Sequence, residues 1–167
     1  MSGLNICVLA ISDTRTLQND ASGAVLGARL DAAGHRLHDR QIVRDDIYAI
    51  RAVVSRWIVD AGAQVILTTG GTGVTGRDGT PEAIAPLLDK TLEGFGELFR
   101  SISFQRIGAS TIQSRCLAGV ANGRYVFCLP GSVDACETGW DHILKAQLDE
   151  TTRPCNFATI LHRLAER

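Results

Sequence analysis

Neither a long apolar run nor a cluster of basic residues occurs in this sequence. The first apolar segment, residues 6–11, is too short to span a bilayer, and no charged segment of a signal peptide precedes it. A formal net charge of −1 supplies no positive field for nucleic acid. These absences disfavour membrane and nucleic-acid partners, and they predict a protein of the cytoplasm.

Disulfide and zinc-binding patterns are also lacking. The five cysteines contain no C-x-x-C pair and mostly have apolar neighbours, so we expect buried free thiols. The four histidines show neither His-x-x-x-His spacing nor clustering with cysteine. A zinc site would need ligands from distant segments of the chain, and none is predicted.

The sequence does contain enough apolar residues to build a core. With 167 residues, of which 45% are hydrophobic and 21% charged, the chain is about one domain long. No internal repeat, low-complexity segment or linker divides it. We therefore predict a single soluble domain over residues 1–167.

In the first half, apolar spacing and turn residues predict alternating strands and helices. A strand–helix unit at 5–34, with Asp20 or Ser22 as the helix cap, leads to a strand at 36–43 and a helix that Asp46 can cap. A strand at 64–69 is followed by a glycine-rich loop and a helix that begins at Thr80-Pro81. This order predicts a parallel sheet with helices on both faces.

The second half predicts an antiparallel extension of that sheet. A helix is expected at 95–106, and strands at 117–120 and 124–129 flank Asn122-Gly123, a strong hairpin signal. Further helices are expected from about Asp134 and, in the tail, at 156–165. The fold class is therefore α/β with a mostly parallel sheet and an antiparallel hairpin.

The glycine-rich loop at 68–81 is the most informative feature for function. Glycines at 70, 71, 73 and 76 bring backbone N–H groups close to the strand end, which suits an anion such as phosphate. Asp78 adds a carboxylate beside that anion. Because two negative groups repel unless a cation lies between them, the sequence indicates a shared divalent metal.

Two familiar glycine motifs fit this loop poorly. The span Gly71 to Gly76 has the G-x-G-x-x-G spacing of a dinucleotide site, but its helix signal comes late and residues 96–98 lie in a helical pattern. A nicotinamide site is therefore a minor alternative. A Walker A loop would require Lys-Ser/Thr where the chain has Arg77-Asp78, so a conventional P-loop nucleotidase is not expected.

Loops that follow parallel strands meet at one edge of a sheet and commonly form one pocket. Four such loops carry polar residues: Ser12-Asp13-Thr14-Arg15, Arg44-Asp45-Asp46, Gly70 to Thr80, and Pro130-Gly131-Ser132. Asp13, Asp46 and Ser132 can equally serve as turn or cap residues. Asp45 is the better catalytic candidate because Asp46 can take the cap. The arginines at 15, 44, 77 and 115 are each more typical of solvated surface charges than of ligands, but together they could balance a polyphosphate.

These residues resemble a known family, the B-type molybdenum cofactor biosynthesis proteins, within the wider molybdopterin-binding domain family. The resemblance covers nearly the whole chain. It is carried by Ser12-Asp13, Thr69-Gly70-Gly71-Thr72-Gly73, Asp78-x-Thr80-Pro81-Glu82-Ala83, Gly94-Phe95-Gly96-Glu97, residues 110–121, Leu129-Pro130-Gly131-Ser132 and Thr152-Arg153-Pro154-Cys155-Asn156-Phe157.

The resemblance implies a three-layer α/β/α sandwich that assembles as a homotrimer or hexamer. It also implies adenylylation of molybdopterin by ATP, with release of pyrophosphate and assistance from Mg²⁺. Asp45 and Asp78 would be catalytic and would hold the metal and the phosphates. Substrate and nucleotide would contact Gly70, Gly71, Thr72, Gly73, Pro130, Gly131 and Ser132, with Ser12, Asp13, Ser114 and Arg115 as further candidates.

One departure from the pattern leaves a second interpretation open. Adenylyltransferase relatives commonly carry proline before the first aspartate, whereas this chain has Arg44, which leaves the Asp45 loop less rigid. The alternative is a catalytically silent molybdopterin-binding subunit of the same pathway. Retention of both Asp45 and Asp78 favours the enzyme, because paired carboxylates suit a metal-assisted site.

Overall fold

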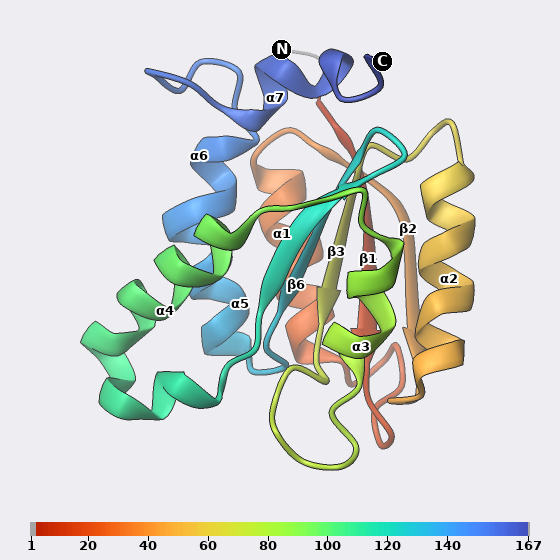
Figure 1. The fold of residues 1–167 in the computed structure, drawn as a ribbon, viewed down its shortest axis with the longest axis vertical. Coiled ribbons are helices and arrows are strands. Elements are labelled where there is room, and N and C mark those ends of the chain that lie inside the picture. The colour runs from red at the N-terminus through yellow and green to blue at the C-terminus, as the bar shows by residue number, and fades with distance from the viewer. Residues whose placement is uncertain (1–2, 167) are drawn as a thin grey trace.

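A single six-stranded sheet organises the protein in the computed structural model, which describes residues 3–166 (Figure 1). The strands are β1 (Asn5–Ile11), β2 (Arg36–Val43), β3 (Val65–Thr69), β4 (Lys90–Thr91), β5 (Leu117–Ala121) and β6 (Arg124–Leu129), in the spatial order β2-β1-β3-β6-β5-β4. The helices are α1 (Ala21–Ala32), α2 (Ile47–Val59), α3 (Thr80–Ile84), α4 (Glu93–Ile107), α5 (Val133–Gly139), α6 (Lys145–Gln147) and α7 (Phe157–Ile160). None of the helices in this range is long and apolar enough to cross a membrane.

The sheet is parallel in β2, β1, β3 and β6, and antiparallel where β5 pairs with β6 and β4 pairs with β5. The hairpin between β5 and β6 turns at Asn122 and Gly123, whose φ angles are 45° and 76°. Two consecutive positive φ angles are what a tight hairpin with right-handed twist requires, which explains the Asn-Gly pair. The predicted α/β fold with an antiparallel extension is confirmed.

Side-chain alternation along the strands builds a core on each face of the sheet. In β1, Ile6 and Val8 join one apolar cluster, while Cys7 and Leu9 join the other. The first cluster is completed by side chains of α1, α4 and α5, and the second by side chains of α2 and α3. Figure 1 shows these two sets of helices on opposite sides of the sheet. Consecutive apolar residues in β1 need cover on both faces of the sheet. The helices provide that cover, and three layers result.

Helix ends largely follow the predicted cap residues. Asp20 caps α1 by accepting from the Gly23 N–H at 3.0 Å, and Asp46 caps α2 by accepting from the N–H groups of its first turn. Gly34 follows α1 with φ 81°, a conformation that favours glycine. Because Asp46 makes the cap, the carboxylate of Asp45 is available for another role.

Three elements differ from the sequence-based expectation. Helix α3 ends at Ile84 and passes into a short 3₁₀ turn (Ala85–Leu87), because Pro86 cannot continue an α-helix. Strand β4 has only two residues, too few to produce a periodic signal. The tail helix is a single turn followed by a 3₁₀ turn at Leu161–Arg163.

The core gives a direct test of the fold. Phe127 is fully buried among aromatic rings, 5.3 Å from the ring of Phe95 and 5.9 Å from that of Phe157. We expect Phe127→Ala to lower the free energy of unfolding by about 3–5 kcal/mol, because a large cavity is left behind. Tyr48 of α2, which is 76% exposed, provides the matched control, and Tyr48→Ala should change stability by less than about 0.5 kcal/mol. Equal losses of unfolding free energy in the two variants, measured by urea unfolding, would contradict this packing.

Candidate functional site

A polar cavity of about 630 Å³ opens at the carboxyl edge of the parallel strands. The strand ends are level there, since Ile11 of β1 pairs with Val43, and Thr69 pairs with Ala10 on one side and Leu129 on the other. The four loops selected from the sequence therefore meet. The predicted residues that line the cavity are Ser12, Asp13, Asp45, Gly70, Gly71, Thr72, Gly73, Asp78, Ser114, Pro130, Gly131 and Ser132.

The glycine loop passes so close to neighbouring segments that side chains at Gly70 and Gly71 are excluded. Gly70 and Gly71 have φ angles of 109° and 64°. A Cβ atom on Gly70 would lie 2.3 Å from the carbonyl oxygen of Ile11, and one on Gly71 would lie 2.6 Å from Oδ2 of Asp45. Glycine is thus required both by conformation and by space. The cavity wall at this point is bare backbone.

Thr80 closes the loop on itself. Its hydroxyl donates to the carbonyl oxygen of Gly70 at 2.8 Å, and its N–H donates to the carbonyl oxygen of Gly71 at 3.0 Å. Thr80 is fully buried, so these bonds are shielded from water. The loop from Gly70 to Thr80 therefore has a fixed base.

Arg115 braces the same loop from outside the cavity. Its Nε donates to the carbonyl oxygen of Gly73 at 2.7 Å and its Nη2 to that of Asp78 at 2.8 Å, while its guanidinium also pairs with Glu82. Its backbone N–H donates to Thr72 at 2.9 Å. Arg115 was predicted as a substrate contact, but the structure places it behind the loop, where it holds the carbonyl groups.

Asp45 stands where β2 ends, against the glycine loop. Its Oδ1 accepts from the N–H of Gly79 at 3.0 Å, and its Oδ2 faces Gly71. Burial raises the pKa of Asp45 above its ordinary value, and the negative charges of Asp78 and Asp13 raise it further, against the hydrogen bond from Gly79. The negative charge of ionised Asp45 is therefore poorly compensated by its surroundings.

Asp78 is in the opposite electrostatic situation. Its Oδ2 accepts from the N–H of Thr75 at 2.8 Å and from the Thr75 hydroxyl at 2.6 Å. The Thr75 hydroxyl, together with the backbone N–H groups of Thr75 and Gly73 and the charge of Arg115, lowers the pKa of Asp78 in spite of partial burial. Two neighbouring carboxylates whose pKa values are shifted in opposite directions are typical of functional sites.

Asp13 lies on the solvent side of this pair and is held by Arg77. The guanidinium of Arg77 donates to both carboxylate oxygens of Asp13, at 2.6 and 3.1 Å, and these bonds lower the pKa of Asp13. Oδ1 of Asp13 also accepts from the N–H of Asp45 at 3.3 Å, which is a long bond. Both side chains are exposed, so solvent screens this ion pair and it contributes little to stability.

Sequence reasoning missed the far wall of the cavity, which comes from α4 and α5. Phe99, Ser103 and Arg106 of α4 line it, and Arg106 donates to the Thr138 hydroxyl at 2.8 Å and pairs with Asp134 of α5. The apolar stripe of α4 indicated only a core helix. Ser103 and Arg106, three positions apart, were the available signal for a polar face.

The cavity lining carries a surplus of negative charge. Five aspartates (Asp13, Asp20, Asp45, Asp78 and Asp134) and three arginines (Arg15, Arg77 and Arg106) line it, and Asp20 is also paired with Arg40, so one formal negative charge is left over. Within residues 3–166 no group of three or more His, Cys, Asp or Glu side chains is placed to hold a metal ion. Mg²⁺, however, commonly binds through one or two carboxylates and completes its shell with water and substrate phosphate. The carboxylates of Asp45 and Asp78 are compatible with this mode of Mg²⁺ binding.

Known proteins with similar sequences and structures point to one family. The family described as "Probable molybdopterin binding domain" matches residues 7–150. Molybdenum cofactor biosynthesis protein B of Escherichia coli K12 is 51% identical over 152 residues, which cover 91% of this chain and 89% of that protein.

Two solved structures show the same fold over almost the full length. The crystal structure of a molybdenum cofactor biosynthesis protein B superposes with a TM-score of 0.89 at 37% identity, covering 100% of this chain and 99% of that one. The tungsten cofactor synthesizing protein MoaB from Pyrococcus furiosus superposes with a TM-score of 0.81 at 34% identity, covering 99% of both chains.

The raised pKa of Asp45 makes a prediction about stability. A carboxylate with a raised pKa in the folded state destabilises that state at neutral pH, and the penalty disappears as the pH falls below the ordinary value of 3.8. Asp45→Asn keeps an acceptor for Gly79 and removes the charge. We expect this variant to unfold at higher urea concentration than the wild type at pH 7, with a difference that shrinks toward pH 4. Asp31→Asn, at an exposed aspartate of α1, is the control. A destabilised Asp45→Asn variant at pH 7 would contradict the electrostatic argument.

Proposed function

Because the chain belongs to the molybdopterin-binding domain family of the molybdenum cofactor biosynthesis proteins, we propose that it adenylylates molybdopterin with ATP in the cytoplasm. The observation that carries the proposal is the meeting of Asp45, Asp78 and the glycine loop in one polar cavity. That combination suits a ligand with several phosphate groups and a divalent cation. A nicotinamide site has no comparable support.

The proposed reaction is a substitution at phosphorus. An oxygen of the terminal phosphate of molybdopterin attacks the α-phosphorus of ATP, the new P–O bond forms, and the bond to the bridging oxygen of the β-phosphate breaks. Pyrophosphate leaves with the electron pair. No group requires strong acid–base catalysis, so the protein contributes mainly by aligning two anions and compensating their charge.

Asp45 and Asp78 would hold the magnesium ion. When bound, this ion supplies positive charge to the phosphate oxygens. Asp45 is suited to the role because its charge is poorly compensated, and Asp78 because its lowered pKa keeps it ionised at neutral pH. Thr75 and Gly79 hold the two carboxylates in place.

The loop backbone would orient the two substrates. Gly70 and Gly71 allow a ligand to approach the main chain closely, since no side chain fits there. Ser132 lines the cavity at the start of α5, which it caps by accepting from the N–H of Ala135 at 3.1 Å. Further proposed contacts to substrate or nucleotide are Ser12, Asp13, Thr72, Gly73, Ser114, Pro130 and Gly131. Arg115 would act through the loop that it braces.

A catalytically silent molybdopterin-binding subunit is the second candidate. The observation that favours it is the attachment of Asp78 to its own loop, where Oδ2 already accepts two hydrogen bonds from Thr75. Such a carboxylate can stabilise the loop without binding metal. Arg44 in place of a proline before Asp45 points the same way, because the backbone there is less constrained.

The two candidates are separated by an activity assay. Purified protein is incubated with molybdopterin, ATP and Mg²⁺, and pyrophosphate release and adenylylated pterin are both measured. We expect product from the wild type and a rate at least about 100-fold lower for Asp45→Asn and Asp78→Asn, with Asp31→Asn unchanged. Absence of product from the wild type, together with saturable molybdopterin binding, would favour the silent subunit. Full activity of Asp78→Asn would refute the metal-site assignment.

The resemblance also predicts assembly. We expect sedimentation equilibrium to give the mass of three or six chains in solution. Several large apolar side chains of α4 and the following turn are exposed, including Phe104, Ile107 and Ile112, which is consistent with contacts between copies. A monomer at micromolar concentration would contradict this prediction.

A further inference from the structure

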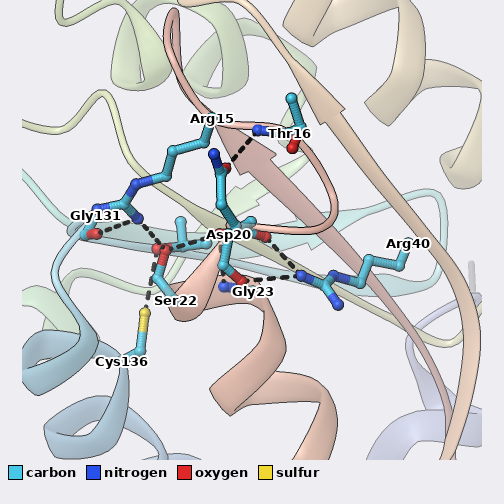
Figure 2. A network of polar contacts seen from close by, with 10 residues as sticks. Arg15, Thr16, Asp20, Ser22, Gly23, Arg40, Gly131 and Cys136 are labelled. Carbon is cyan, nitrogen blue, oxygen red and sulfur yellow. Dashed lines mark hydrogen bonds and ion pairs between the residues drawn. The ribbon is translucent and has the colours of Figure 1, made fainter.

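Arg15 lines the cavity but has no assigned partner in the proposed reaction. It belongs to the loop between β1 and α1, and its side chain points toward the start of α5 (Figure 2). Its Nη1 donates to the Ser22 hydroxyl at 3.0 Å and makes a long contact of 3.5 Å with the carbonyl oxygen of Gly131. Both partners are neutral.

The other two arginines of the cavity are already neutralised. Arg77 pairs with Asp13, and Arg106 pairs with Asp134. Arg15 forms no ion pair with any of the residues that the structure describes. Among the arginines that line the cavity, Arg15 is therefore the one whose guanidinium can still bind an anion, since only its Nη1 is hydrogen-bonded.

A buried carboxylate stands behind Arg15. Asp20 is 1% exposed, and it accepts from the N–H of Gly23, from the Ser22 hydroxyl at 3.1 Å and from Nη2 of Arg40 at 2.9 Å. Burial works to raise the pKa of Asp20, but these donors together lower it below the ordinary value. Figure 2 shows Asp20 between Arg40 on one side and Ser22 on the other.

Ser22 lies between the carboxylate of Asp20 and the guanidinium of Arg15, and its hydroxyl orients the arginine. The hydroxyl has one proton, and that proton is donated to Asp20. The oxygen lone pairs are consequently left for the guanidinium of Arg15, which donates to them. Because Ser22 is 2% exposed, water cannot easily replace either partner. Arg15 itself is exposed, so its remaining N–H groups face the cavity and solvent.

We propose that Arg15 binds a phosphoryl group of the substrate, and that Ser22 and the buried Asp20 are positioning residues for its guanidinium. This inference rests on the proposed function for the identity of the ligand, but it concerns a contact that neither carboxylate supplies. Arginine binds two phosphate oxygens at once, which gives direction as well as charge. The same chemistry serves a pterin phosphate or a nucleotide polyphosphate.

Isothermal titration of the full chain with pyrophosphate, ATP plus Mg²⁺, and molybdopterin tests the contact. We expect Arg15→Gln to weaken binding of a phosphate-bearing ligand at least about tenfold. Arg56→Gln is the matched control, because Arg56 is an exposed arginine of α2 outside the cavity and without an ion pair. A loss confined to pyrophosphate and ATP identifies nucleotide phosphate, and a loss confined to molybdopterin identifies pterin phosphate. Unchanged affinity for all three ligands overturns the inference.

The positioning role has a separate readout. Ser22→Ala should weaken binding about threefold and leave the melting temperature within a few degrees of the wild type, and in the Arg15→Gln background it should add nothing. Additive losses would show that Ser22 acts independently of Arg15. If the wild type forms no adenylylated product but phosphate binding still depends on Arg15, the proposed reaction fails and this inference stands. If product forms and Arg15→Gln changes neither Kd nor KM, the inference alone fails.

Discussion

The close approach of Gly70 and Gly71 to neighbouring segments is the constraint on which the site depends. Gly70 lies against the carbonyl end of β1, and Gly71 lies against the carboxylate of Asp45 at the end of β2. Only residues without a Cβ atom permit both contacts. The loop can then turn back, and Thr80 closes it with two hydrogen bonds. The segments that follow β1, β2 and β3 therefore contact one another at the cavity.

The carboxylates of Asp45 and Asp78 differ in their electrostatic surroundings. Asp45 is partly buried and lies near other negative charges, so its pKa rises, whereas Asp78 is surrounded by donors of its own loop and its pKa falls. The protein thus maintains a local shortage of positive charge beside a backbone wall. A divalent cation bound together with a polyphosphate would relieve that shortage. In the proposed reaction, stability and function are opposed at Asp45, a trade-off that is common at active sites.

The two sides of the cavity differ in how far their polar side chains are buried. The glycine-loop half is fixed by buried Thr80 and by Arg115, which bridges three carbonyl groups. On the side of β1, Asp20 and Ser22 are buried and ordered, whereas the Arg15 that they orient is exposed. In the proposed binding mode, Arg15 contacts the ligand with a guanidinium whose direction is already set by buried partners.

The sequence by itself predicted a parallel sheet covered on both faces, because apolar runs in strands that alternate with apolar stripes in helices favour that arrangement. It also identified the four loops, since strand ends in a parallel sheet must meet at one edge. What only the tertiary structure decided were the partners of each charge. Arg115 contributes backbone support and not cavity lining, Arg106 enters from α4, and Asp20 is both a helix cap and the anchor for Ser22. Each of these contacts joins side chains from separate segments or uses a side chain in two roles, and local spacing carries no information about which donor reaches which acceptor.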